Sequence, residues 1–556
     1  MKRLRTIKRV LAVFLTLALV ITLSGITKNV AYAADPTYSI TISNSANDDG
    51  THTYEAYEVF DVSLNASGEP VVNDWGAGVN GPALLDALKN DATIGTYFAT
   101  ASSATDVAAI LTDNITVFAS DTAANKDFDT ETKAFVKIVA ANLSGTVAGT
   151  SSNNVISDLP VGYYFVQDAN APGPANPTTG DNNGAYTRFI LQLIKDENIT
   201  IASKSDAPKL VVKINEDSYS TDDGFGTGYN DVADYAVEEE VPYELIATLP
   251  TNTSAYDTYK VVFNDVLDTV LENPKDFVVT INGQEIDSSK YTVSDTSTGT
   301  FKITINDIFD AVGATTPAQK EALDGKDIVV TYTATLTDDA VPGTGYENTV
   351  TLTYSNDPND SGSTSTKTGL TPPDEVIVFT NAQDFTKVDS VNQTIKLADA
   401  KFIVYKGTGA NKQYATLDAN GKVTGWVASE ANATKITSKA DGTFRVSGLD
   451  SKDTYYLHET DAPSGYALAT NDVSFVIPSA IITQQNWDGT QAGAYTADTN
   501  DANGEFVGDN ENITNTKLTA TLPTTGGIGT TVFYVVGIIL VLGAGVLLIT
   551  RKRSRN

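Results

Sequence analysis

The chain has 556 residues, of which 69 are acidic and 37 are basic, and its formal net charge of −32 argues against nucleic-acid binding. It contains no cysteine, which excludes disulfides, zinc–thiolate sites and a cysteine nucleophile within the chain. Its only histidines are His52 and His458, so it offers little material for a Ser-His-Asp hydrolase.

The first 34 residues have the pattern of a secretory signal peptide. Five basic residues lie within the first nine positions, and a largely apolar run follows over residues 10–23. Ala31-Tyr32-Ala33 then supplies an A-x-A-like cleavage site. We therefore expect a secreted chain that begins near Ala34.

Many short runs alternate apolar and polar residues, and Asn, Asp and Gly lie between them. Such period-two patterning predicts β-sandwich or Greek-key domains. Expected strands include residues 38–42, 161–166, 301–305 and 350–354. Helical patterns are sparse: one covers residues 82–89 and a second covers 317–323, each opening on a proline. The expected fold class is mainly all-β, with tandem immunoglobulin-like sandwich domains and a short helix in the first domain.

Proline-containing polar stretches near residues 203–208 and 371–373 divide the secreted part into three domains. The expected units are residues 1–34 (signal peptide), 35–203 (first domain), 204–381 (middle domain), 382–517 (third domain) and 518–556 (C-terminal signal).

The C-terminal signal has three consecutive parts. Its pentapeptide consists of Leu522, Pro523, Thr524, Thr525 and Gly526. An uncharged, apolar run then covers residues 530–550, about the ~20 residues that a transmembrane helix needs. Basic residues follow from Arg551 onward, so this end should stay cytoplasmic.

Together these parts resemble the LPxTG sorting signal of Gram-positive surface proteins. The resemblance implies that a sortase cuts between Thr525 and Gly526 and passes the Thr525 acyl group to an amine. The span is then a transient sorting helix, and the product is anchored to the cell wall.

The third domain carries an ordered set of motifs. Residues 385–389 open it, residues 441–444 and 455–466 follow, and residues 512–516 close it. This order resembles a Cna B-type domain, the module of Gram-positive adhesins and pilins. The resemblance implies an amide between Lys387 and Asn515, formed with the assistance of a buried acid, Glu459.

The implied reaction makes physical sense. Burial lowers the pKa of a lysine and raises that of a carboxylic acid, so the amine can attack while the acid shuttles protons. Contact between amine and carboxamide supplies the proximity advantage. The reaction runs once, so the chain is not expected to be an enzyme with turnover.

The middle domain has a similar plan and resembles the middle domain of three-domain backbone pilins. There the assisting acid is usually Asp, and the resemblance assigns Lys213, Asp265 and Asn348 to a second internal amide. Lys209 is the rival lysine and Asp268 the rival acid.

The first domain departs from this pattern. Residues 163–168 have the shape of the acid-bearing motif, but Gln167 stands where Glu is expected. We expect no internal amide there, and the alternative is a bond assisted by Asp168.

The joint before the middle domain contains Lys204. In backbone pilins a lysine in a Tyr-Pro-Lys motif occupies this place and attacks the sortase-bound acyl group. Here the local sequence is Ala202-Ser203-Lys204, without Tyr or Pro. Lys204 is assigned as the inter-subunit amine by its position, with Lys195 and Lys209 as alternatives.

These features predict a structural shaft subunit of a covalent pilus, joined Thr525-to-Lys204. Implied partners are a class C-type pilin sortase, the housekeeping sortase, other copies of the chain, ancillary pilins, peptidoglycan and a host surface or matrix ligand. The alternative is a monomeric or ancillary wall-anchored adhesin. No cofactor is expected. No metal is expected either, because the acidic loop at 498–505 lacks full calcium-loop spacing.

Overall fold

The structure is a computed structural model of the chain. It describes residues 36–45, 48, 50–118, 130–170, 184–195, 197–203, 205–217, 228–294, 296–297, 299–482, 485–496, 506–518 and 528–553. The signal peptide, Lys204, the pentapeptide 522–526 and the acidic loop 498–505 lie outside these residues.

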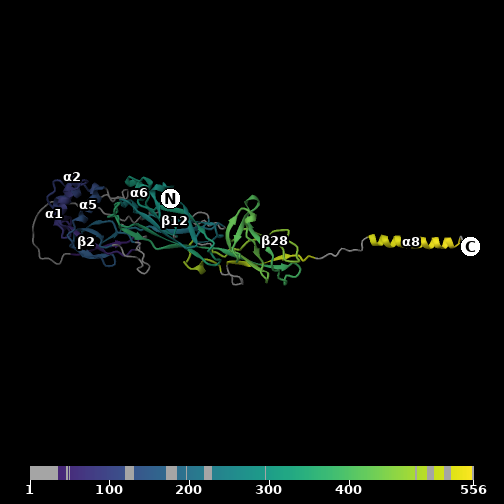
Figure 1. The fold of residues 1–556 in the computed structure, drawn as a ribbon. Coiled ribbons are helices and arrows are strands. Elements are labelled where there is room, and N and C mark those ends of the chain that lie inside the picture. The colour runs from purple at the N-terminus through teal and green to yellow at the C-terminus, as the bar shows by residue number, and fades with distance from the viewer. Residues whose placement is uncertain are drawn as a thin grey trace, which may run out of the picture.

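The strands fall into three successive sets that lie in a row along the molecule (Figure 1). The first set, β1 to β8, forms one sheet with the order β5-β1-β8 and another with the order β3-β2-β6-β7, in which β4 pairs with β2. The strands are β1 (Tyr38–Ser43), β2 (Tyr54–Leu64), β3 (Pro70–Trp75), β4 (Gly149–Thr150), β5 (Val155–Leu159), β6 (Gly162–Asp168), β7 (Ile190–Ile194) and β8 (Ile199–Ala202).

The first domain is more helical than predicted. Its helices are α1 (Gly81–Asn90), α2 (Gly95–Phe98), α3 (Ala104–Asp113), α4 (Ile115–Phe118) and α5 (Thr130–Ala141). The expected helix at 82–89 is α1, and the other four helices were not predicted. In α3, Val107, Ala108 and Leu111 are buried at helical spacing, and Ser103 and Asp106 form a capping box that fixes its start.

The middle domain packs two sheets face to face, with orders β10-β9-β12-β18-β14-β15 and β11-β21-β19-β13-β17-β16, and β20 pairs with β19. Its strands are β9 (Lys209–Asn215), β10 (Tyr229–Asn230), β11 (Val232–Asp234), β12 (Glu240–Thr248), β13 (Val261–Leu267), β14 (Leu271–Ile281), β15 (Gln284–Glu285), β16 (Thr292–Val293), β17 (Thr300–Ile305), β18 (Asp327–Leu336), β19 (Tyr346–Ser355), β20 (Thr368–Leu370) and β21 (Asp374–Phe379). Its short helices are η1 (Thr253–Ala255), η2 (Ser288–Lys290), α6 (Ile308–Val312) and α7 (Pro317–Glu321). Strict alternation of buried and part-exposed residues along β18 shows why period two predicted this architecture.

The third domain also has two sheets, with orders β27-β22-β30 and β25-β24-β23-β28-β29, and β26 pairs with β23. The strands are β22 (Asn381–Asp389), β23 (Lys401–Lys406), β24 (Gln413–Leu417), β25 (Val423–Val427), β26 (Ile436–Thr437), β27 (Thr443–Leu449), β28 (Tyr455–Asp461), β29 (Val473–Phe475) and β30 (Val507–Asn515), with short helices η3 (Gly409–Asn411), η4 (Glu430–Asn432) and η5 (Gln491–Gly493). The first strand β22 and the last strand β30 run parallel side by side, and Asp389 pairs with Asn515.

The domains are joined in two different ways. One continuous apolar core runs through the middle and third domains and includes Tyr243, Tyr332, Phe385 and Phe402. The first domain keeps two cores of its own, both built from its own residues. Its contact with the middle domain therefore depends more on polar groups.

The last element is α8 (Ile528–Arg553), which stands at the C-terminal end (Figure 1). Within it, Thr531–Arg553 is long and apolar enough to cross a membrane, with a mean hydropathy of 2.9 and none of its most apolar window buried. The predicted C-terminal apolar helix is thus confirmed, and the folded β domains do not depend on it.

Candidate functional site

The third domain brings the three predicted residues Lys387, Glu459 and Asn515 together. Lys387 lies on β22, Glu459 on β28 and Asn515 on β30. Lys387 Nζ is 3.0 Å from Glu459 Oε1, and Asn515 Nδ2 donates a 2.8 Å hydrogen bond to Glu459 Oε2. The carboxyl group thus bridges an amine from the first strand and a carboxamide from the last.

The three side chains of this trio are buried. Lys387 is 0% exposed, and Glu459 and Asn515 are 3% exposed. The Phe402 ring centroid lies 5.1 Å from Lys387 Nζ. Burial lowers the pKa of Lys387, although Glu459 opposes the shift. A larger fraction of this lysine is therefore a neutral amine than would be the case in water.

Backbone groups orient the Asn515 carboxamide and the Glu459 carboxyl group. Asn515 Nδ2 also donates to the Ala467 carbonyl over 2.6 Å, and Glu459 Oε2 accepts the Ala469 N–H over 2.8 Å. Within the described residues, buried Asn515 Oδ1 accepts no hydrogen bond. That oxygen is therefore available to accept a proton while the amine attacks the carboxamide. General acid catalysis requires such a proton acceptor on the reacting group.

The middle domain assembles only two of its three predicted residues. Asp265 on β13 and Asn348 on β19 are fully buried and meet through Tyr332 on β18. The Tyr332 hydroxyl donates to Asp265 Oδ2 over 2.8 Å and accepts from Asn348 Nδ2 over 2.8 Å. Burial raises the pKa of Asp265 to about 7, although hydrogen bonds from Tyr332 and Asn348 oppose the shift.

The assignment of Lys213 to this site was wrong. On β9, Val212 and Ile214 point into the core, so the alternation of the strand turns Lys213 to the opposite face. Lys213 Nζ donates instead to Asp231 Oδ1 over 2.5 Å and to the Gln485 carbonyl over 2.6 Å. The rival Lys209 has the same strand parity and is exposed. A phenol therefore contacts the acid and the carboxamide where an amine was expected.

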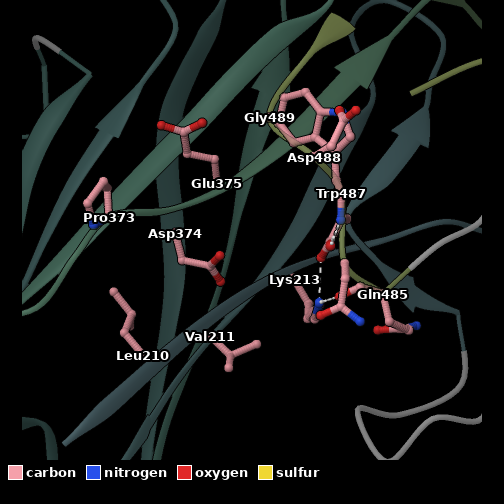
Figure 2. Close-up of a pocket in the computed structure, with 12 residues that line it drawn as sticks. Leu210, Val211, Lys213, Pro373, Asp374, Glu375, Gln485, Trp487, Asp488 and Gly489 are labelled. Atoms are coloured by element: carbon pink, nitrogen blue, oxygen red, sulfur yellow. Dashed lines mark hydrogen bonds and ion pairs between the residues drawn. The ribbon is translucent and has the colours of Figure 1, made fainter. Parts of the chain in front are cut away.

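Lys213 instead lies in a groove of about 780 Å³ that the sequence did not predict. The groove lies between β9, the start of β21 and residues 485–489 of the third domain, and Figure 2 shows Lys213 beside Gln485 and Trp487. The Trp487 N–H donates to Asp231 Oδ2 over 2.7 Å, so one carboxylate holds both the lysine and the third-domain segment. The other acidic residues that line the groove are Asp374, Glu375 and Asp488.

In the first domain, Asp168 contacts a histidine. Asp168 Oδ1 lies 2.8 Å from His52 Nδ1, and its Oδ2 accepts the Thr187 N–H over 2.6 Å. The two residues are 116 positions apart, and no sequence motif connects them. The bond assisted by Asp168 that was considered as an alternative would have a histidine, not a lysine, beside its acid.

Two stretches of the chain match family models. Residues 382–491 match the model of the SpaA prealbumin-like fold domain. Residues 515–556 carry an LPXTG cell wall anchor motif. The predicted sorting signal is confirmed, and the chain is a surface protein anchored to the cell wall after a transient membrane span.

Several solved structures are similar in fold. The major pilin SpaD of Corynebacterium diphtheriae is 17% identical over 88% of this chain and 99% of that chain, with a TM-score of 0.45. A backbone pilin of Streptococcus pyogenes is 17% identical over 88% of this chain and 100% of that chain, with a TM-score of 0.46. The major pilin RrgB of Streptococcus pneumoniae is 14% identical over 86% of this chain and 100% of that chain, with a TM-score of 0.38. Among curated proteins, none matches the sequence. These likenesses concern the fold alone.

Proposed function

We propose that this chain is the shaft subunit of a covalent, sortase-assembled pilus. The observation that carries the proposal is the preassembled trio of Lys387, Glu459 and Asn515 in the domain that precedes the wall anchor. An internal cross-link between first and last strands suits a cysteine-free protein that must transmit tension outside the cell.

The proposed internal reaction is an aminolysis. The Lys387 amine forms a C–N bond to Asn515 Cγ, the bond from Cγ to Nδ2 breaks, and Nδ2 leaves as ammonia. Glu459 carries protons between the amine, the carbonyl oxygen and the leaving nitrogen. The middle-domain amide is not part of the proposal, because Lys213 lies on the opposite face of β9 from Asp265 and Asn348.

The proposed assembly reaction joins separate subunits. A pilin sortase cleaves the bond between Thr525 and Gly526, and its cysteine holds the Thr525 acyl group. The amine of Lys204 in the next subunit then attacks, forms the amide and releases the sortase thiol. The housekeeping sortase transfers the finished polymer to peptidoglycan, and ancillary pilins complete the fibre.

Peptide mapping of wall-extracted polymer tests this linkage. Tryptic digestion should release a branched peptide that joins Thr525 to Lys204. A branch at Lys195, Lys209 or Lys213 would replace Lys204 but keep the shaft proposal. Wall peptide attached to Thr525 in every molecule, without any inter-subunit branch, would favour a monomeric wall-anchored adhesin, the second candidate.

A further inference from the structure

A buried histidine lies between two carboxylates at the junction of the first and middle domains. His52 Nδ1 is 2.8 Å from Asp168 Oδ1, and His52 Nε2 is 3.3 Å from Asp48 Oδ2. The side chains of His52 and Asp48 are 0% exposed and that of Asp168 is 1% exposed. The Tyr54 ring stacks on the imidazole with centroids 5.3 Å apart and planes 4° from parallel.

A proton on the imidazole balances the charges of this cluster. Burial raises the pKa of Asp168, although the hydrogen bond and charge of His52 oppose the shift. Two buried carboxylates repel each other unless a cation lies between them. Burial alone would lower the pKa of His52, but hydrogen bonds and charges from Asp168 and Asp48 outweigh it and raise the pKa to about 9. The nearby Tyr54 and Tyr354 have raised pKa values because of burial, so they stay neutral phenols when the imidazolium titrates.

The same carboxylates hold a strap of the first domain, residues 184–189. Asp168 Oδ2 accepts the Thr187 N–H over 2.6 Å, and Asp48 Oδ2 accepts the Ala185 N–H over 3.4 Å. The cluster therefore fixes the strap through backbone amides on either side of Tyr186.

The other edge of the strap binds the middle domain between β19 and β20. Tyr186 N–H donates to the Asn356 carbonyl over 2.7 Å. Asn359 Nδ2 donates to the Thr187 carbonyl over 2.9 Å, and Asn359 Oδ1 accepts the Phe189 N–H over 3.0 Å. An unbroken path of polar contacts thus runs from His52 to the middle domain.

We propose that protonated His52 is a clamp that holds the first domain in a fixed orientation on the middle domain. With the proton present, both carboxylates stay in place and the strap stays docked. When the proton leaves, Asp48 and Asp168 repel each other and the strap loses its anchor. Because the pKa is raised in the folded state, this stabilisation is complete below about pH 6.5 and disappears as the pH rises through about 9.

Other charged groups also lie at the junction of the first and middle domains. Lys133 and Lys137 pair with Asp257 at 2.5 and 3.2 Å, and burial lowers the pKa of Lys133. Lys367 Nζ contacts the Tyr186 hydroxyl at 3.4 Å, and Asp206 accepts from Ser45 Oγ at 3.2 Å. A test must therefore connect loosening of the joint to His52 itself.

The composition of the chain makes such a test practical. With two histidines and no cysteine, imidazole NMR signals are few, and spin labels attach only to introduced cysteines. Residues 34–525 can be used, because α8 is not part of the folded body. Ser67→Cys in the first domain and Ser289→Cys in the middle domain, both exposed, would report the interdomain distance by pulsed electron resonance.

The expected result is a narrow distance distribution at pH 6–7 that broadens with a midpoint equal to the NMR midpoint of His52. Asp168→Asn should lower the NMR midpoint of His52 by about one pH unit or more, since one opposing charge is removed. It should also reduce the broadening, because Asp48 then has no second carboxylate to repel it. His458→Gln is the matched control and should leave both midpoints unchanged. His52→Gln should give the broad distribution wherever both carboxyl groups are ionised, at neutral and alkaline pH.

Three results would overturn the clamp. One is a His52 midpoint at or below about pH 6.5, the ordinary value. Another is a distribution that stays narrow to pH 10 in the wild type. The last is a broadening in Asp168→Asn as large as that of the wild type. The wild-type titration alone decides the question if His52→Gln fails to fold.

Discussion

Asn515 donates its side-chain N–H to Glu459 across 2.8 Å, and the other oxygen of the same carboxyl group lies 3.0 Å from the Lys387 amine. This geometry places a proton carrier between nucleophile and leaving group before any reaction occurs.

The intact mass of residues 34–525 should fall below the calculated mass by one ammonia, about 17 Da. The third domain holds amine, acid and carboxamide together, whereas the middle domain has Tyr332 in place of an amine. High-resolution mass spectrometry should detect the loss, and tryptic peptides should locate it at Lys387 and Asn515. An unmodified mass would contradict the third-domain reaction, and a loss of about 34 Da would reveal a second site.

Glu459→Gln should abolish the mass loss, because unassisted aminolysis is slower by about 10²–10⁴-fold. The variant should also unfold more easily. By analogy with disulfides, a cross-link that closes a loop of about 100 residues is worth about 4–5 kcal/mol. Mass spectrometry and thermal unfolding measure the two effects, and Glu430→Gln on the exposed surface is the control. A Lys387–Asn515 peptide in Glu459→Gln would assign the proton transfers to another group.

Tyr332→Phe should destabilise the middle domain without changing the mass loss. Removal of the hydroxyl leaves buried groups of Asp265 and Asn348 without a partner, which costs about 1–3 kcal/mol. Hydrogen exchange of peptides from β13 and β18 reports this cost locally. Tyr97→Phe, in the first domain, is the matched control. Unchanged exchange in Tyr332→Phe would show that the hydroxyl does not hold the pair.

The protonation of Asp265 should make the middle domain lose stability as the pH rises. Its pKa is about 7 in the folded state and 3.8 ordinarily, so the folded state binds more protons between these values. The contribution is complete below about pH 4 and is lost as the pH rises through about 7. Each pKa unit of difference is worth about 1.4 kcal/mol.

Asp265→Asn removes this titration while keeping the shape of the side chain. Hydrogen exchange of β13 and β18 should therefore be compared between wild type and Asp265→Asn at matched pH values from 4 to 8. The wild type should become progressively less protected relative to the variant. A constant ratio of exchange rates across this range would show that Asp265 does not titrate there.

Local patterns predicted the β architecture because the alternation of apolar and polar residues along a strand is visible in the sequence itself. The expected strands at 301–305 and 350–354 lie within β17 and β19, and the helix at 317–323 corresponds to α7. The additional helices of the first domain were missed, although Ser103 and Asp106 formed a readable capping box before α3.

The two predicted cross-link sites had different outcomes for a physical reason. Lys387, Glu459 and Asn515 lie in strongly patterned motifs, and their strands do bring them together. Lys213 was assigned by its position in the motif. Along β9, however, Leu210, Val212 and Ile214 face the core, so Lys213 faces the other side of the sheet. The Tyr332 contact and the pairing of His52 with Asp168 depend on long-range packing, which no local pattern specifies.

Immunoblotting of cell-wall extracts tests covalent polymerisation most directly. Wild-type cells that contain the pilin sortase should give a ladder of high-mass bands that resist boiling in SDS. Lys204→Arg cells should give only the wall-linked monomer, because a guanidinium is not a usable nucleophile at neutral pH. Lys209→Arg and Lys213→Arg are the matched controls and should keep the ladder. A single band in wild-type cells with the sortase present would contradict the shaft and leave a monomeric wall-anchored protein.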